Sequence, residues 1–158
     1  MPQLSMKTPL GDITVSEEEG RIVSIDWGWA RDQDETPVLT RARDQLEAYF
    51  DGDLTAFDLP LDPAGTAFQH AVWREMLAIP YGETRTYGQL EAKVGGTARS
   101  VGTACGANPI PIIIPCHRVV AANGLGGFSA EGGVVTKSAL LRLEGALPAT
   151  LFDSVAAR

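Results

Sequence analysis

A chain of 158 residues is long enough for one ordinary domain or for two small ones. Hydrophobic residues make up 44% of it and its mean hydropathy is −0.01, which excludes an intrinsically disordered chain and a membrane protein. The net charge of −7, taken over the whole chain, argues against a nucleic-acid partner.

Nothing in the sequence predicts a membrane segment, a secretory leader or a metal site. The longest apolar run, residues 110–115, is too short to span a bilayer and is broken by prolines. The N-terminus lacks the basic-then-apolar order of a secretory signal, so we expect a cytoplasmic protein. Cys105 and Cys116 are too few for a disulfide framework and have no zinc-binding spacing, so we expect neither a metal nor a cofactor.

The charge is distributed unevenly along the chain. Residues 1–65 contain 5 Lys/Arg and 14 Asp/Glu, a net charge of −9, whereas residues 66–147 contain 7 and 5, a net charge of +2. Residues 148–158 contain one of each. The part from 66 to 147 is therefore the only one whose charge suits a DNA-facing surface, and a charge of +2 binds phosphate weakly without help from geometry.

The first 65 residues predict a small sheet with one helix packed on it. Residues 4–7, 12–15 and 21–27 are typical of short strands separated by turns. A helix follows, with Thr36 as its cap and Pro37 at its first position. Residues 58–65, which contain two prolines, are interpreted as a linker to a second domain.

The next part of the chain predicts three consecutive helices that end at about residue 107. Each begins at a threonine cap, the first two with a capping-box partner: Thr66 with Gln69, Thr86 with Gln89, and Thr97. Gly95-Gly96 joins the second helix to the third. Two short helices joined by a glycine turn favour a helix-turn-helix, a motif whose second helix enters a DNA groove.

The third helix is almost without bulky side chains, and Arg99 is its one long, charged projection. The pattern alone leaves two interpretations open. The helix either packs tightly in a core, or lies very close to another surface. It carries too few Arg, Asn or Gln residues for a helix that reads major-groove bases, so the second interpretation indicates a minor groove.

The segment from 108 to 120 is the most informative part of the sequence. Three prolines stiffen and bury an apolar run, and Cys116 follows where a helical turn can begin. A cysteine is a strong nucleophile as the thiolate, which needs a cationic or hydrogen-bonding neighbour, and His117 and Arg118 are adjacent. The alternative is a buried structural thiol, the interpretation that we give to Cys105 inside the small-residue helix.

A family resemblance lies in the same segment. The motifs resemble those of the 6-O-alkylguanine-DNA alkyltransferases (methylated-DNA–protein-cysteine methyltransferases): Asn108-Pro109, Pro115-Cys116-His117-Arg118-Val119, Gly132-Gly133, Lys137 and residues 140–145. The resemblance is strong over residues 66–147. It implies an α/β (α+β) fold, with a small N-terminal ribonuclease-H-like sheet-plus-helix domain (1–65), a mainly helical winged helix-turn-helix domain (66–147) and a C-terminal tail (148–158).

The resemblance also implies an activity, direct-reversal DNA repair. An alkylated guanine is flipped out of duplex DNA, and its 6-O-alkyl group is transferred irreversibly to Cys116 in a single turnover. Four residues take catalytic roles: Cys116 as the acceptor, His117 as a base acting through a water, Glu144 as the residue that orients His117, and Asn108 as a brace for the turn. From its residue type alone, Glu144 would be a solvated acid.

The remaining implied roles concern binding. Tyr87 faces the flipped nucleotide and protonates the departing guanine, and Arg99, next to Ala98, fills the gap in the base stack. The main chain of Cys116 and Val119 holds the guanine edge, and Phe128 and Ser129 lie on the loop over the pocket. The implied partner is double-stranded DNA that contains 6-O-alkylguanine, bound through its minor groove by a protein that we expect to be a monomer.

Two other classes of protein stay open from the residues alone. One is a non-catalytic helix-turn-helix module that binds DNA or marks lesions, although lesion-marking relatives replace the acceptor cysteine and this chain keeps Cys116. The other is a thiol hydrolase or redox enzyme, which needs a resolving cysteine or a histidine distant in sequence. Turnover separates them, because an alkyltransferase stops at one equivalent.

Overall fold

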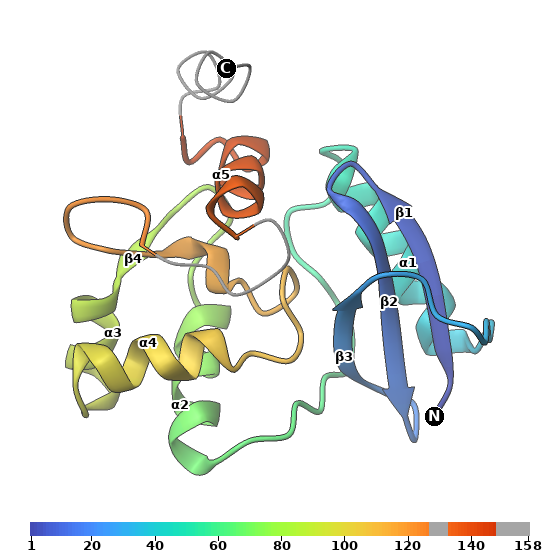
Figure 1. The fold of residues 1–158 in the computed structure, drawn as a ribbon, viewed down its shortest axis with the longest axis horizontal. Helices are drawn as coiled ribbons and strands as arrows, with labels where there is room; N and C mark the ends of the chain where they lie inside the picture. The colour runs from blue at the N-terminus through green and yellow to red at the C-terminus, as the bar shows by residue number, and fades with distance from the viewer. Residues whose placement is uncertain (127–132, 148–158) are drawn as a thin grey trace. The chain divides into compact units, whose positions relative to one another are not determined.

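The computed structural model of the protein describes residues 1–126 and 133–147. The elements in chain order (Figure 1) are β1 (Gln3–Thr8), β2 (Gly11–Glu18), β3 (Arg21–Trp27), α1 (Pro37–Phe50), α2 (Ala67–Leu77), β4 (Arg85–Thr86), α3 (Tyr87–Val94), α4 (Ala98–Gly106), the 3-10 turn η1 (Cys116–Arg118), β5 (Val119–Val120) and α5 (Gly133–Leu143). Two compact units arise: 1–64 with 109–111, and 65–108 with the described residues from 112 onward. No helix in these residues is both long and apolar enough to cross a bilayer.

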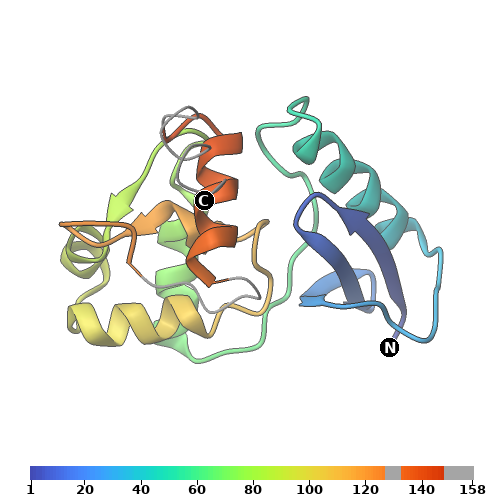
Figure 2. The same ribbon diagram turned by 45° about the horizontal axis from the view of Figure 1, so that its top comes forward.

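The first unit is an antiparallel sheet in the order β1-β2-β3 with α1 packed against it (Figure 2), as the sequence predicts. The helix begins where expected, because the Thr36 hydroxyl accepts from the main-chain N–H of Leu39 at 3.3 Å and Pro37 is the first helical residue. Glu17, buried in β2, accepts from the Thr36 hydroxyl at 2.6 Å and so connects the sheet to the start of α1.

The interpretation of residues 58–65 as a linker is incomplete. The main-chain N–H of Ile22 donates to the Pro60 carbonyl, and that of Asp62 donates to the Ile22 carbonyl, both at 2.8 Å. The main-chain N–H of Ile25 donates to the Pro109 carbonyl at 2.9 Å. Hydrogen-bonding groups of β3 are thus satisfied by two segments that have no strand pattern in the sequence. This pairing is why residues 109–111 belong to the first unit.

The helices of the second unit begin at their predicted caps. Both capping boxes form, and a third forms between Thr97 and Ser100. The turn between α3 and α4 requires glycine, because Gly96 has a φ of +76° and a Cβ there would lie 3.1 Å from the Phe68 ring. The Trp73 indole donates to the Ala104 carbonyl at 2.9 Å and joins α2 to α4. The helix-turn-helix prediction is therefore confirmed.

The faces of α4 decide between the two interpretations of its small residues. Val101, Ala104 and Cys105 are buried and provide the packing of the helix. Ala98, Thr103 and Gly106 are exposed, so the solvent-facing side is also nearly without bulk. Core packing does not account for small residues on an exposed face, which favours a helix shaped for close approach to another surface.

A short parallel pairing positions the site. Arg85 pairs with Val119 and Thr86 with Val120, so β4 and β5 lie side by side. Tyr87, the first residue of α3, therefore follows a strand that is hydrogen-bonded to the residues directly after η1. Helix α5 packs against η1. Segments from before and after Cys116 in the sequence, β4 with the start of α3 and the helix α5, are in this way gathered around it.

Candidate active site

The loop from 108 to 115, called here the acceptor loop, is held rigidly before Cys116. The Asn108 side-chain amide donates to the Ile114 carbonyl at 2.8 Å, and the same carbonyl accepts from the main-chain N–H of Cys116, also at 2.8 Å. Ile112 is buried and has a φ of +74°, a conformation that is strained for a β-branched residue. Only a tightly determined loop keeps such a residue in place.

The turn η1 sends its three side chains to different surroundings. Cys116 is partly exposed, whereas His117 and Arg118 are buried. The turn is closed by the main-chain N–H of Arg118, which donates to the Pro115 carbonyl at 3.0 Å. In a 3-10 turn successive side chains point about 120° apart, because each turn contains three residues. One side chain can therefore face outward while its two neighbours face inward.

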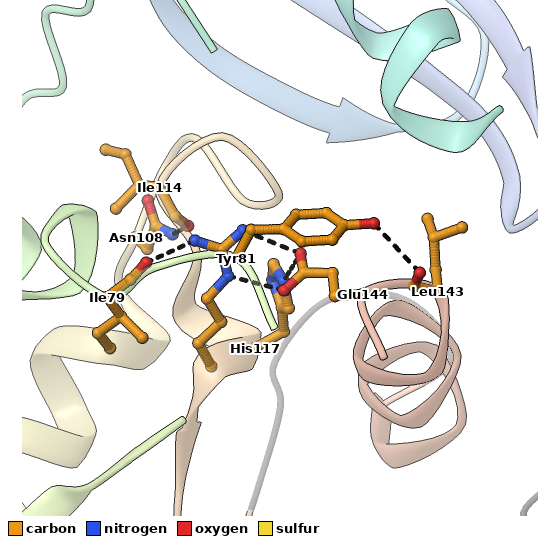
Figure 3. A network of polar contacts seen from close by, with 8 residues as sticks. Ile79, Tyr81, Asn108, Ile114, His117, Leu143 and Glu144 are labelled. Carbon is orange, nitrogen blue, oxygen red and sulfur yellow. Dashed lines mark hydrogen bonds and ion pairs between the residues drawn. The ribbon is translucent and has the colours of Figure 1, made fainter. Parts of the chain in front are cut away.

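Glu144 is the centre of a buried polar network (Figure 3). One carboxylate oxygen, Oε2, lies 2.7 Å from His117 Nε2 and accepts from Arg118 Nη2 at 3.1 Å, and Oε1 accepts from Arg118 Nε at 2.7 Å. The remaining guanidinium nitrogen, Nη1, donates to the Ile79 carbonyl at 2.6 Å. Glu144 is 4% exposed, so the expectation from its residue type, a solvated acid, is wrong. Its place beside His117, which the family resemblance implies, agrees with the structure.

The network fixes the chemical state of His117. Burial lowers the pKa of the imidazole, and the hydrogen bond to Glu144 opposes that shift in part. A neutral ring that donates from Nε2 to a carboxylate carries its lone pair on Nδ1. Nδ1 is buried and has no hydrogen-bond partner among the described residues. His117 is therefore arranged as a proton acceptor at Nδ1.

The cation expected beside the thiol is not Arg118, whose guanidinium is bound to Glu144 and to the Ile79 carbonyl. Burial raises the pKa of the Cys116 thiol, and a hydrogen bond from Asn108, the charge of Lys137 and nearby main-chain groups act against this. The sequence analysis has Lys137 in the family motif without a role, although the sequence contains a signal that it is buried. Lys137 lies three and four positions before Leu140 and Leu141, on the apolar face of α5.

The other thiol and Tyr87 complete the surroundings of the acceptor. Burial raises the pKa of Cys105 to about 12, which agrees with its interpretation as a structural thiol. Tyr87 is partly buried, and burial raises the pKa of its phenol, so this hydroxyl stays protonated near neutral pH. A Cβ at Gly126 would lie 3.1 Å from the Tyr87 hydroxyl oxygen, and the φ of +74° at this position also favours glycine beside the ring.

The predicted DNA-facing residues lie apart from the buried network. Ala98 and Arg99 are exposed on the first turn of α4, where Arg99 lines a shallow groove together with Thr66 and Phe68 at the start of α2. Val119 is buried, and its carbonyl accepts from the Lys137 ammonium at 2.6 Å. Phe128 and Ser129, predicted to lie over the pocket, fall outside the described residues.

A helix-turn-helix unit that carries a partly exposed cysteine beside a buried histidine–glutamate pair defines a class of protein, a DNA-binding protein with a nucleophilic thiol. Comparison with known proteins agrees. Residues 67–146 match the model of the 6-O-methylguanine DNA methyltransferase DNA-binding domain, and residues 4–63 match that of the ribonuclease-like domain of the same proteins. The chain therefore belongs to the 6-O-methylguanine DNA methyltransferase family.

Individual relatives are similar over most of their length. The methylated-DNA–protein-cysteine methyltransferase of Mycobacterium tuberculosis H37Rv is 56% identical over 122 residues, 73% of each chain. That of Methanosarcina acetivorans is 41% identical over 150 residues, 88% of this chain and 95% of the relative. The structure is also similar to the crystal structure of Mycobacterium tuberculosis OGT in complex with DNA, with a TM-score of 0.83 and 42% sequence identity. The similarity spans 96% of this chain and 98% of that one. The predicted fold class is confirmed.

Proposed function

We propose that this protein repairs DNA by moving the alkyl group of 6-O-alkylguanine onto Cys116. The Cys116 sulfur attacks the alkyl carbon, a carbon–sulfur bond forms, and the bond from that carbon to the guanine oxygen breaks with its electron pair leaving on the guanine. The thioether has no further nucleophile to remove it, so each molecule acts once. The observation that carries the proposal is the partly exposed Cys116 at the start of η1, directly before the buried His117–Glu144 pair.

Activation of the thiol follows from this arrangement. The Cys116 proton passes through a water to His117, whose lone pair on Nδ1 is maintained by the hydrogen bond from Nε2 to Glu144. The neutral, buried imidazole supports the role of base, because a ring that was already protonated could not accept a proton. Asn108 braces the acceptor loop and stabilises the thiolate by a hydrogen bond.

The departing guanine needs a proton or a hydrogen bond, since it leaves with negative charge. The Tyr87 phenol is the donor we propose, and burial keeps it protonated. The main-chain carbonyls of Cys116 and Val119 accept from the guanine edge. A carbonyl has two acceptor positions, so Val119 can bind both Lys137 and guanine. Phe128 and Ser129 complete the pocket in this proposal.

Access to the lesion requires that the base leave the stack, which takes a few kcal/mol. The exposed face of α4, which carries Ala98, Thr103 and Gly106, allows the helix to approach a minor groove closely. Arg99 lies at the start of this face and fills the gap that the flipped base leaves. Contacts of this kind read little sequence, which suits damage that occurs in any context. We propose that a monomer binds in this way.

The test is mass spectrometry of the intact protein and its peptides after incubation with duplex DNA that carries one 6-O-methylguanine. We expect a gain of one methylene unit on the peptide that contains Cys116, saturating at one equivalent. Cys116→Ser should bind the DNA but gain no mass, and stoichiometric repair by that variant would make the acceptor assignment wrong. DNA binding without any gain in the unaltered protein would favour the non-catalytic module, and repeated turnover would favour a thiol hydrolase.

A further inference from the structure

Lys137 is a buried charge for which the mechanism above has no use except as a neighbour of the Val119 carbonyl. Its side chain is 0% exposed, although it lies on α5 only four residues after the first residue of that helix. Burying an ammonium group is strongly unfavourable unless its charge and its donor hydrogens are used. A lysine in this position therefore needs a reason beyond packing, because an aliphatic residue fills the same volume without that penalty.

The contacts of Lys137 indicate what it does. Its ammonium donates to the Val119 carbonyl at 2.6 Å and lies 5.9 Å from the centre of the Tyr87 ring. Val119 directly follows η1, and Tyr87 is the first residue of α3. One ammonium group thus contacts the strand after the acceptor turn and the aromatic ring at the start of α3. Burial lowers the pKa of this ammonium, and both contacts are of a kind that favours the charged form of lysine.

Several elements among the described residues bring titratable groups to this ammonium. Tyr87 of α3, Cys105 of α4, and Cys116 and His117 of η1 interact with it, while Arg118 and Glu144 belong to the buried network that holds His117. Arg118 and His117 are bound to Glu144, so that carboxylate is engaged by η1. Cys105 keeps its proton, since burial raises its pKa to about 12. Among the described residues, Cys116 is therefore the group whose anionic form this ammonium stabilises.

We propose that Lys137 is a positioning residue: anchored on the Val119 carbonyl, its ammonium supplies the positive charge that favours the Cys116 thiolate. The same hydrogen bond fixes the carbonyl on which guanine is expected to bind. The inference rests on the proposed function for its role in transfer, but its effect on the thiol is independent of DNA and can be measured without it.

Three variants separate charge from hydrogen bonding. Lys137→Arg keeps both, Lys137→Gln keeps a donor without charge, and Lys137→Met keeps neither. The readout is the pH dependence of Cys116 alkylation by iodoacetamide, located by peptide mass spectrometry on the folded protein. We expect the midpoint to rise by about one pH unit in the Gln and Met variants, to stay near that of the unaltered protein in the Arg variant, and to stay unchanged in Lys93→Met, which removes an exposed lysine.

Methyl transfer from 6-O-methylguanine DNA is measured alongside. The Gln and Met variants should transfer more slowly and recover part of the loss at higher pH, which a purely structural role would not produce. Unchanged alkylation midpoints in folded Gln and Met variants would overturn the proposal. If the unaltered protein accepts no methyl group, the proposed function fails, while the alkylation profiles still decide the role of Lys137.

A measurement on the unaltered chain covers the case in which the charge-removing variants do not fold. In protein labelled with ¹⁵N-lysine, the Nζ chemical shift of Lys137 is followed through the titration of Cys116. A step at the alkylation midpoint, absent once Cys116 carries an iodoacetamide adduct, is expected. A Nζ shift that does not respond to the ionisation of Cys116 would refute the proposed coupling.

Discussion

The buried Arg118–Glu144 pair allows a prediction in which stability and activity respond differently. Glu144 accepts three contacts from His117 and Arg118, and Arg118 is 7% exposed. In Glu144→Gln the guanidinium is left buried without the Glu144 charge, and in Arg118→Met the carboxylate loses the guanidinium that pairs with it. Each single change should lower the free energy of unfolding by about 3–5 kcal/mol, the usual cost of removing one partner of a buried ion pair.

The double variant distinguishes pairing from two separate losses. If the two changes acted independently, their sum of about 6–10 kcal/mol would leave an ordinary domain unfolded. Because Arg118→Met removes the charge that Glu144→Gln leaves uncompensated, we expect the double variant to be folded and at least as stable as either single one. Its methyl transfer should stay slow, since a neutral amide no longer stabilises the imidazolium that forms when His117 accepts a proton.

The measurement is urea unfolding of the four proteins, with single-turnover transfer rates under native conditions. His117→Gln serves as a matched control, because it removes the base while Arg118 and Glu144 keep their contacts. It should be slow in transfer, by about 100-fold or more, with a smaller loss of stability. An additive loss of stability in the double variant, or full transfer activity in it, would refute this account of the network.

Three further predictions follow from the charges of the site. Because burial lowers the pKa of His117, the unfolded chain binds a proton below about pH 6.5 that the folded protein does not bind. The free energy of unfolding should therefore fall as the pH drops below this value, by at most about 1.4 kcal/mol per pH unit. Urea unfolding at a series of pH values should show this loss in the unaltered protein, and His117→Gln should lack the part that comes from His117. Iodoacetamide near pH 8 should label Cys116 in the folded protein and Cys105 only after unfolding, and labelling of native Cys105 would contradict its raised pKa of about 12. Two of the seven Lys/Arg in residues 66–147, Arg118 and Lys137, are buried, which leaves five that can contact phosphate. A plot of the logarithm of DNA affinity against the logarithm of salt concentration should therefore have a slope no steeper than about −4.5. A steeper slope would mean that other groups contact phosphate.

Local signals in the sequence predicted local structure well. The caps at Thr66, Thr86 and Thr97 all begin helices, because a capping box is satisfied within four residues and needs nothing from the rest of the fold. The turn at Gly95-Gly96 was predictable for the same reason, since its backbone conformation favours glycine. The pairing of β3 with residues 60–62 and with Pro109 had no such signal, because main-chain groups of any residue type can complete a sheet edge.

The interior of the site was predictable only in part. The resemblance implied Glu144 beside His117, which the structure has, but residue type alone predicted a solvated acid. The burial of Glu144 depends on Arg118, and that pairing joins residues 26 positions apart. Lys137 was present in the motif without an assigned task, because its acceptor is a main-chain carbonyl, and no side-chain pattern identifies a carbonyl in advance.

Adjacency in the sequence was the least reliable guide to function, and the geometry of η1 explains why. Cys116, His117 and Arg118 suggested a thiol flanked by two groups that could activate it. In a 3-10 turn their side chains diverge by about 120°, so His117 and Arg118 both turn inward to Glu144 while Cys116 keeps partial access to solvent. The charge near the thiol has to come from a residue distant in sequence, and Lys137 of α5 supplies it. A single short turn thus separates the reacting sulfur from the carboxylate, whose negative charge would otherwise disfavour the thiolate.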